Sequence, residues 1–336
     1  VNTRSSVDPF LTFSSNRRLR KQVWRAFKNR GDNGDANDTN QVIAEIMALP
    51  AERAQILGFA THAHFRMDDT MARDPARAQE LMLRVWRPAV ARVQEEVRDM
   101  AAIARRQGAR ITIEPWDYNF YAEQVRRDRY DLDQNELRPY FELNNMIDAS
   151  FYMANQLYGL SFHEITGTVT VFEPNVRVWE VTDRDGSYLG LFYGDYFARA
   201  GKSSGAWAQE FQSYETFTGR TLTTITSNNN NFVGGAPGEP VLISLDDAQT
   251  LFHEFGHALD GLMSRANYPS LASTPRDYVE YPSQVHEHWV LTRPVLDRFA
   301  RHYQTGAPMP QELVERIDNA STFNQGYATV AYLSSA

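Results

Sequence analysis

Five consecutive residues, His-Glu-Phe-Gly-His at positions 253–257, constrain the fold of this chain more than any other stretch. Positions four apart lie on one face of an α-helix, so a helix here lets His253 and His257 point at a single metal ion. Glu254 then stands beside that ion, where it can deprotonate a water molecule. With eight histidines in 336 residues, the pattern His-Glu-x-x-His arises by chance roughly 0.01 times in a chain of this length.

The alternative is an ordinary exposed helix with solvated polar side chains, and Gly256 does lower helix propensity. The flanking residues argue against it, because Leu251, Phe252, Ala258 and Leu259 are apolar and predict a buried helix. Burying two imidazoles and a carboxylate without partners is costly, and a bound metal removes that cost. The chain has no cysteine, so any zinc must be held by imidazole and carboxylate groups.

A catalytic zinc site needs three protein ligands and one open position for water. One class of zinc peptidase has Gly and His at the positions equivalent to 260 and 263, but here they are Asp and Met, which excludes that class. A second class takes a Glu from a later helix, and Glu280 is the candidate, with Pro282 starting the new helix. A kinked helix from Thr274 is the alternative. We expect one zinc ion per chain, bound by His253, His257 and Glu280.

Several nearby side chains are candidates for holding the ligands in place. Gln284 lies four residues after Glu280, on the same face if one helix spans both, and its amide oxygen can accept an imidazole N–H. Asp260, just past His257, is a second candidate. His286 and His288 are weaker candidates for the same role.

Hydrophobic periodicity divides the rest of the chain into helices and a β-rich stretch. The pattern predicts helices over residues 16–30, 75–107, 142–158, 245–263, 283–303 and 310–333. Between residues 169 and 226 the period changes, and it predicts a β-hairpin over 176–193 and a strand over 220–226 that continues to Asn231 and Phe232. The fold class is therefore mostly α with a small β-sheet. Pro88 should kink the helix over 75–107 or split it in two.

No domain boundary is evident in the sequence. The chain is expected to form a single catalytic region, roughly helical over 1–160, β-rich over 161–244 and helical with the zinc site over 245–336. The turn-rich stretch Gly31–Asn40 is predicted to be a solvated loop, because its acidic residues lack the ordered ligand positions of a calcium-binding loop.

Composition limits the partners of the chain. The net charge of −8 argues against a nucleic-acid ligand, and the sequence has no apolar run long enough to cross a membrane. The first fifteen residues lack the pattern of a signal peptide, so we expect a cytoplasmic protein. A periplasmic location stays open, because the chain opens on Val1 and a leader can precede it.

Two segments carry a family resemblance. Thr250–Met263, TLFHEFGHALDGLM, and Asp277–Trp289, DYVEYPSQVHEHW, resemble the thimet oligopeptidase family of zinc peptidases, in particular its bacterial peptidyl-dipeptidase (dipeptidyl carboxypeptidase) branch. The resemblance runs from about Phe10 to the end of the chain. Further similar stretches are Asn29–Asn40, Pro115–Arg126, Tyr130–Tyr158, Val176–Trp207 and Phe323–Leu333.

The resemblance implies that His253, His257 and Glu280 are zinc ligands and that Glu254 is the general base. It implies a multi-helix zincin-type region, within a two-lobed molecule with a deep channel and a small sheet near the zinc. The sequence departs from the family at Asp260, where members often have His. The family's N-terminal lobe, and a Gly-rich segment whose His and Tyr residues stabilise the oxyanion, are expected outside these 336 residues. The chain is therefore expected to be the central part of a longer enzyme.

The function expected from this resemblance is zinc-dependent hydrolysis of short peptides, with release of C-terminal dipeptides. The alternatives are an endo-acting oligopeptidase of the same family, a zinc- and peptide-binding fragment without turnover, and a purely helical structural protein. An intact Glu254 argues against a mere binder. By analogy with similar zinc peptidases, the strand ending at Asn231 and Phe232 is expected to bind the substrate backbone as an added strand, unless residues 228–231 form only a loop.

Overall fold

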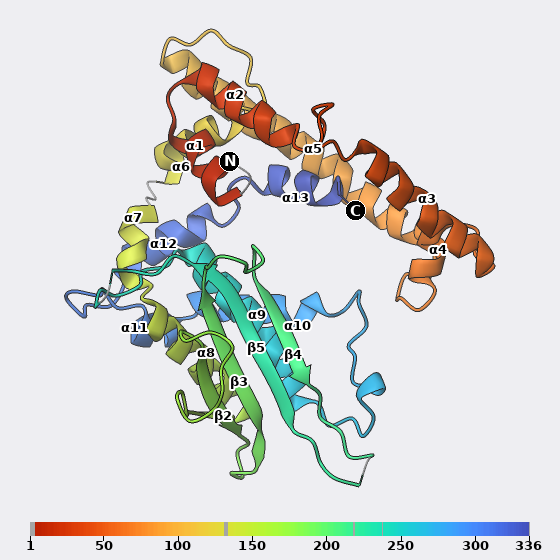
Figure 1. Cartoon of the computed structure of the whole chain (residues 1–336). Helices are drawn as coiled ribbons and strands as arrows, with labels where there is room; N and C mark the ends of the chain where they lie inside the picture. The colour runs from red at the N-terminus through yellow and green to blue at the C-terminus, as the bar shows by residue number, and fades with distance from the viewer. Residues whose placement is uncertain (1–3, 131–133, 218, 237, 336) are drawn as a thin grey trace. The chain divides into compact units, whose positions relative to one another are not determined.

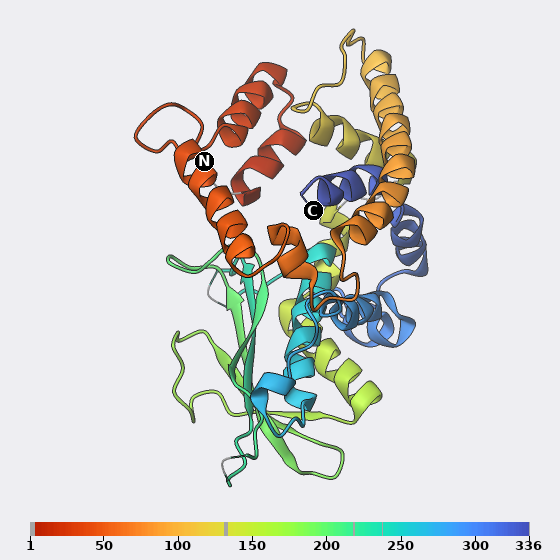
Figure 2. The same cartoon turned by 90° about the vertical axis from the view of Figure 1, so that its right-hand side faces the viewer.

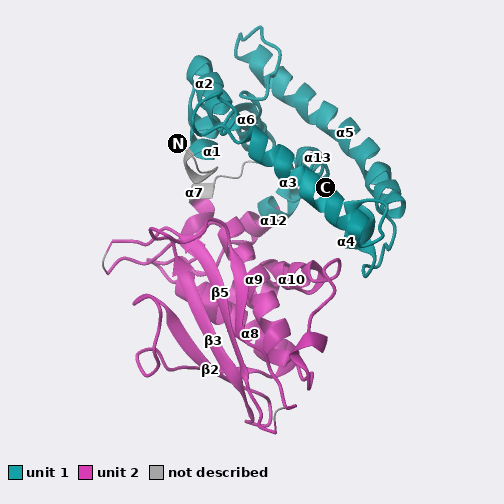
Figure 3. Ribbon diagram, turned by 45° about the vertical axis from the view of Figure 1, so that its right-hand side comes forward, with its two compact units in different colours: residues 1–132, 316–336 teal, residues 133–315 magenta. Residues whose placement is uncertain are grey.

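The computed structural model describes residues 4–130, 134–217, 219–236 and 238–335, and it divides the chain into two compact units (Figure 3). Unit 1 consists of Val1–Leu132 and Arg316–Ala336, and unit 2 consists of Asp133–Glu315. The three-part division expected from the sequence differs from this arrangement, because residues 133–160 belong with the β-rich and zinc-site segments. Unit 2 therefore contains every residue of the predicted zinc site.

Unit 1 is helical and is organised along one long helix, α5 (Pro75–Arg106). Asp74 caps this helix by accepting the N–H of Ala76, and Pro75 occupies its first turn. Pro88 does not split α5, which is continuous. The other helices of unit 1 are α1 (Arg4–Phe13), α2 (Arg17–Lys28), α3 (Asn40–Ile56), α4 (His62–Met67), α6 (Tyr118–Tyr130) and α13 (Gln325–Leu333).

The core of unit 1 lies between α5 and α6. Buried residues of both helices pack together there: Met100, Ile103, Ala104, Tyr118, Tyr121, Ala122 and Val125. The predicted loop over Gly31–Asn40 is confirmed up to its last residue, where α3 begins. Within it, Asp38 accepts the main-chain N–H groups of Gly34 and Asn40, so this carboxylate stabilises the turn itself.

Unit 2 is built on a mixed five-stranded sheet with the order β1-β2-β3-β5-β4 (Figure 1). The strands are β1 (Ser161–Glu164), β2 (Arg177–Thr182), β3 (Tyr188–Phe197), β4 (Trp207–Gln212) and β5 (Thr224–Phe232). The predicted hairpin is confirmed, since β2 and β3 pair antiparallel across a turn that ends at Gly186. The strand predicted over 220–226 and on to Phe232 is confirmed from Thr224 as β5, which pairs parallel with β3 and antiparallel with β4. Strand β4 was not predicted from the sequence.

Helices α8 and α9 pack against one face of this sheet, which Figure 2 shows nearly edge-on. The helices of unit 2 are α7 (Gln134–Leu137), α8 (Leu143–Tyr158), α9 (Leu245–Met263), α10 (Glu280–Glu287), α11 (Arg293–Phe299) and α12 (Gln311–Ala320), the last of which continues into unit 1. The described part of unit 2 also contains three short 3-10 helices: η1 (Arg138–Tyr140), η2 (Pro269–Leu271) and η3 (His288–Leu291). Among the described residues, no helix combines the length and apolarity needed to cross a membrane. The fold class predicted from the sequence, mostly α with a small sheet, is confirmed.

An aromatic cluster joins α9 to α8 and to the sheet. Phe255 of α9 lies 5.7 Å from Phe151 of α8 and 5.3 Å from Phe192 of β3, measured between ring centroids. Phe255 and Phe192 are fully buried. The Phe255–Phe192 contact is edge-to-face, and contacts of this kind add to the free energy gained by burial. The helix that carries the His-Glu-Phe-Gly-His motif is therefore anchored in the core of unit 2.

Two helices predicted from the sequence are interrupted in the structure. The predicted helix over 283–303 is wrong as a single element, because Thr292 is extended and the separate helix α11 begins at Arg293, with Pro294 in its first turn. The predicted helix over 310–333 ends at Ala320 and resumes at Gln325, because Asn324 adopts a left-handed backbone conformation with φ of 60°. In both cases a residue with non-helical backbone geometry interrupts a helix that the hydrophobic periodicity predicts to be continuous.

A capping box begins the zinc-site helix α9. The Ser244 hydroxyl accepts the N–H of Asp247 (3.0 Å), and the Asp247 carboxylate accepts the N–H of Ser244 (3.0 Å). These bonds satisfy two donors that a helix N-terminus otherwise leaves unpaired.

Replacing Ser244 by Ala should lower the free energy of unfolding by about 1 kcal/mol, because one cap bond is lost. The matched control is Ser264→Ala at the other end of α9, where Ser264 uses its main-chain N–H to bond Gly261. Denaturant unfolding of both variants and the wild type is the measurement. Equal stability of the two variants would contradict the role of the cap.

Candidate metal centre

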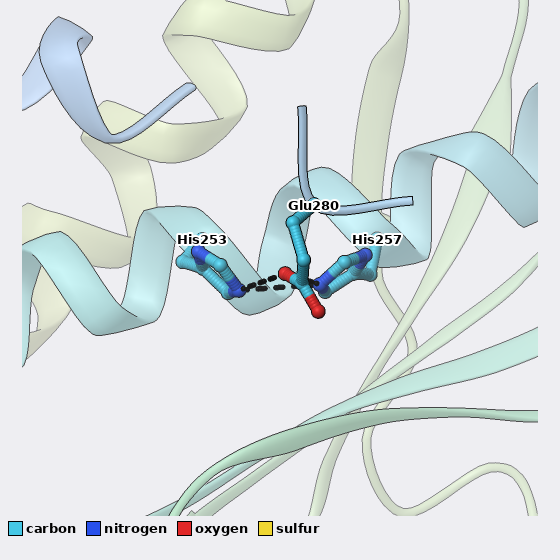
Figure 4. Close-up of side chains that lie close together, drawn as sticks. All are labelled: His253, His257 and Glu280. Carbon is cyan, nitrogen blue, oxygen red and sulfur yellow. Dashed lines mark hydrogen bonds and ion pairs between the residues drawn. The ribbon is translucent and has the colours of Figure 1, made fainter. Parts of the chain in front are cut away.

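The two histidines of the motif lie one turn apart on α9, as the spacing predicts. Their Nε2 atoms are 3.2 Å from each other. Glu280 is the first residue of α10, and its Oε2 lies 3.1 Å from Nε2 of His253 and 3.2 Å from Nε2 of His257 (Figure 4). The structure thus brings together the three residues that the sequence nominated as ligands, although 22 residues separate Glu280 from His257.

The three donor atoms form a nearly equilateral triangle, and this shape allows a test of the fit to zinc. Ligand atoms bound tetrahedrally at about 2.0–2.1 Å from zinc are about 3.3 Å apart. The observed edges of 3.1 to 3.2 Å are close to that value. Two imidazoles and one carboxylate are also a donor set that zinc accepts in catalytic sites. The residues therefore fit the ion, and a fourth position is left for a water or a substrate oxygen.

Protonation of the two imidazoles also suits a metal site. The carboxylate of Glu287, in the last turn of α10, lies 2.6 Å from Nδ1 of His253. A carboxylate accepts the proton on Nδ1, which leaves the lone pair of Nε2 directed at the centre of the triangle. Burial lowers the pKa of His257, which favours the neutral imidazole that a metal ligand requires.

Glu287 has the role that the sequence analysis assigned to Gln284, which is to accept a hydrogen bond from a ligand imidazole. The side chain of Gln284 is exposed on α10, whereas Glu287, seven residues after Glu280, places a carboxylate oxygen 2.6 Å from Nδ1 of His253. The seven-residue spacing of Glu280 and Glu287 was the feature of the sequence that could have predicted this contact. Asp260 lines the same cavity as the ligands, but its Oδ2 accepts the hydroxyl of Thr274 (2.7 Å) instead of an imidazole N–H. Its charge acts on His257 from a distance, against the effect of burial.

Glu254 is positioned as the sequence predicts for a base. It is on α9 between the two histidines and is 8% exposed. Burial raises the pKa of its carboxyl group to about 7, and a hydrogen bond from the main-chain N–H of Ala208 acts in the opposite direction. A carboxyl group with a pKa in this range can take up and release a proton near neutral pH.

The metal-ligand triangle opens onto a cavity of about 420 Å³. Its walls come from α9, from the start of α10 and from β4 and β5, so the small sheet lies beside the candidate zinc site as expected. The lining residues are Ala206, Trp207, Ala208, Glu210, Thr226, His253, Glu254, His257, Asp260, Val279 and Glu280. The cavity is large enough for part of a peptide.

The prediction that β5 binds an added substrate strand is corrected by the sheet order. Strand β5 pairs with β3 as far as Phe232 and with β4 over Ile225–Asn229, so it offers no continuous free edge to an added strand. Asn231 instead donates its side-chain N–H groups to the carbonyls of Ser203 and Gly205 (2.8 and 2.7 Å), and Phe232 is buried. The outer strand beside the cavity is β4, which the sequence analysis missed because its residues mix apolar and polar types without alternation.

The chain is similar to known peptidases over almost all of its length. Residues 10–336 match Peptidase family M3. The chain is 43% identical over 335 residues to a dipeptidyl carboxypeptidase of Escherichia coli K12, covering 99% of this chain and 49% of that protein. It is 32% identical over 326 residues to oligopeptidase A of Salmonella typhimurium, covering 94% of this chain and 47% of that protein. It is also 32% identical over 345 residues to a probable cytosolic oligopeptidase A of Arabidopsis thaliana, covering 98% and 48%.

The chain thus spans about half the length of the curated relatives it matches. The family match covers α9 and α10 entirely, and with them the three candidate ligands and Glu254. The resemblance drawn from the two motif segments is confirmed. The chain belongs to Peptidase family M3, a family of zinc metallopeptidases.

Proposed function

We propose that this chain supplies the zinc site and the general base of an enzyme that hydrolyses peptide bonds in short peptides. The observation that carries the proposal is the triangle of His253, His257 and Glu280, whose edges suit one zinc ion, with Glu254 beside it. When bound there, zinc would polarise the scissile carbonyl group and lower the pKa of a water molecule.

Glu254 takes the proton of the attacking water and then delivers it to the nitrogen of the leaving amine. Its position on the zinc helix puts the carboxylate at the wall of the cavity, next to the ligands. Burial favours the protonated form of Glu254, which suits the second of these two proton transfers. A nearby dication favours the carboxylate form, which suits the first.

Among the described strands β4 lies at the edge of the sheet, and its free edge supplies the main-chain contacts for the substrate. An extended peptide pairs with an exposed strand through main-chain hydrogen bonds, which makes such binding tolerant of side-chain identity. Ala208 of β4 directs its N–H towards Glu254, so the unpaired side of this strand faces the site where the peptide bond is cleaved. We therefore transfer the substrate-backbone role from Asn231 and Phe232 to β4.

The preferred cleavage is the release of dipeptides from peptide C-termini. It rests on the relative with 43% identity, which is named a dipeptidyl carboxypeptidase. The second candidate is endo-acting cleavage, which is supported by the relatives named oligopeptidase A. Short peptides are the expected substrates in either case.

Zinc binding is the first test. The wild-type chain should bind about one zinc ion, as a three-ligand site predicts, and Glu280→Ala should lose the ion on dialysis. Glu210→Ala is the matched control, because Glu210 lines the same cavity and is not part of the triangle. Elemental analysis after dialysis gives the answer, and equal zinc contents of wild type and Glu280→Ala would remove Glu280 from the ligand set.

The base is tested by Glu254→Gln in the complete protein. The amide is similar in size but cannot act as a base, so kcat should fall at least about 10²-fold while zinc stays bound. Glu210→Gln, which changes a neighbouring carboxylate of the cavity, should keep most of its turnover. Retention of more than about a tenth of the wild-type kcat by Glu254→Gln would exclude it as the base.

The cleavage mode is tested by digesting one peptide in two forms, with a free and with an amidated C-terminus. Mass spectrometry should detect successive loss of dipeptides from the free form and slow cleavage of the amide, because a dipeptidyl carboxypeptidase must recognise the terminal carboxylate. Internal cleavage of both forms at equal rates would favour the endo-acting alternative.

A further inference from the structure

The short helix α10 carries both carboxylates that touch the imidazoles of α9. Glu280 at its first residue contacts His253 and His257, and Glu287 at its last residue contacts Nδ1 of His253. The metal site therefore depends on where α10 sits relative to α9, to within fractions of an ångström.

Helix α10 has little stability of its own. It is 8 residues long, and Val279 at its N-cap makes no side-chain hydrogen bond. Isolated helices of this length are marginal in water, so contacts with the rest of the fold must hold α10 in place. We therefore searched the buried face of α10 for those contacts.

The first contact is a close backbone approach at Gly256. A Cβ atom built at Gly256 would lie 2.8 Å from Cα of Ser283 and 2.8 Å from Nδ1 of His286. Such distances leave no room for any side chain at position 256. The two helices therefore touch along their backbones, at the residue that directly precedes His257. This contact sets the spacing of the helices but does not stop α10 from rotating or sliding.

The second contact is a chain of hydrogen bonds through His286, which is 4% exposed. Its Nδ1 lies 2.6 Å from the carbonyl oxygen of Pro282, and its Nε2 lies 2.9 Å from the hydroxyl of Tyr158. A carbonyl oxygen only accepts, so Nδ1 carries the proton and Nε2 accepts the hydroxyl proton of Tyr158. Burial lowers the pKa of His286 and raises that of Tyr158, which agrees with a neutral imidazole and an intact hydroxyl.

Tyr158 connects these hydrogen bonds to a buried helix. It is the last residue of α8, and α8 is anchored in the core of unit 2. The buried residues of α8 are Leu143, Met146, Ile147, Ala149, Ser150, Met153 and Ala154. Through His286, α10 is therefore tied to a third element, α8, in addition to its contact with the zinc helix α9.

We propose that the hydrogen bond from Tyr158 to His286 is a positioning contact of the zinc site: it fixes the rotation of α10 on α9, so that Glu280 and Glu287 stay in reach of the imidazoles. The inference rests on the zinc site proposed above. Neither Tyr158 nor His286 touches the ligand atoms, so their effect on the metal passes through the placement of α10.

The test is Tyr158→Phe, which removes one hydroxyl and keeps the ring. Its zinc Kd, measured by competition with a chelator, should rise about tenfold, the lower end of what loss of an outer partner of a metal ligand costs. The visible spectrum of the Co(II)-substituted chain should also change, because it reports ligand geometry. The matched control is Tyr196→Phe, which removes the hydroxyl of another tyrosine of unit 2, 2% exposed and located on β3.

A role limited to general stability would lower the Tm of Tyr158→Phe and leave the zinc Kd and the Co(II) spectrum equal to those of Tyr196→Phe. That result would overturn the inference. A wild-type chain that takes up no zinc would instead overturn the proposed function on which the inference rests, so the two failures are distinguishable.

A second variant guards against loss of folding in the first. His286→Leu removes the acceptor of the bond, and it should raise the zinc Kd by a similar factor. Adding Tyr158→Phe to His286→Leu should cause little further loss, because the shared bond is already absent. Fully additive losses would show that the two residues act separately and would contradict a positioning bond between them.

Discussion

The backbone contact between α9 and α10 at Gly256 is the constraint on which the candidate site depends. Helix α9 by itself supplies two imidazoles, which are one ligand short of a catalytic zinc site. The third ligand comes from a different helix after a long loop, and it reaches the imidazoles because no side chain separates the two backbones at position 256. The low helix propensity of glycine is therefore offset by the close approach that it permits.

The sheet serves the same site from the other side. The aromatic cluster around Phe255 holds α9 against the sheet, and the strand order puts β4 at the edge next to the cavity. The proposed metal site needs rigid support, and the proposed peptide substrate would pair with a free strand edge. In unit 2, α9 links these two features, because it bears two of the candidate ligands and also packs against β4 and β5.

Local patterns predicted much of this arrangement, and long-range pairing explains what they missed. The helix over 245–263 and the two histidines follow from a spacing of four residues, and Glu280 follows from its distance along the chain. The residue of α10 that contacts His253 is Glu287 and not the predicted Gln284. This outcome depends on the rotation of α10 about its axis, which tertiary contacts fix. The inner position of β5 depends on its pairing with β3 and β4, and no periodicity within one strand encodes its neighbours.

The central claim is that three side chains from α9 and α10 bind one zinc ion between them. The most direct measurement is anomalous X-ray scattering at the zinc edge from crystals of the zinc-loaded protein. The account predicts one strong peak between Nε2 of His253, Nε2 of His257 and a carboxylate oxygen of Glu280. A peak bound to Asp260 or Glu287 in place of Glu280, or no peak at the two histidines, would contradict it.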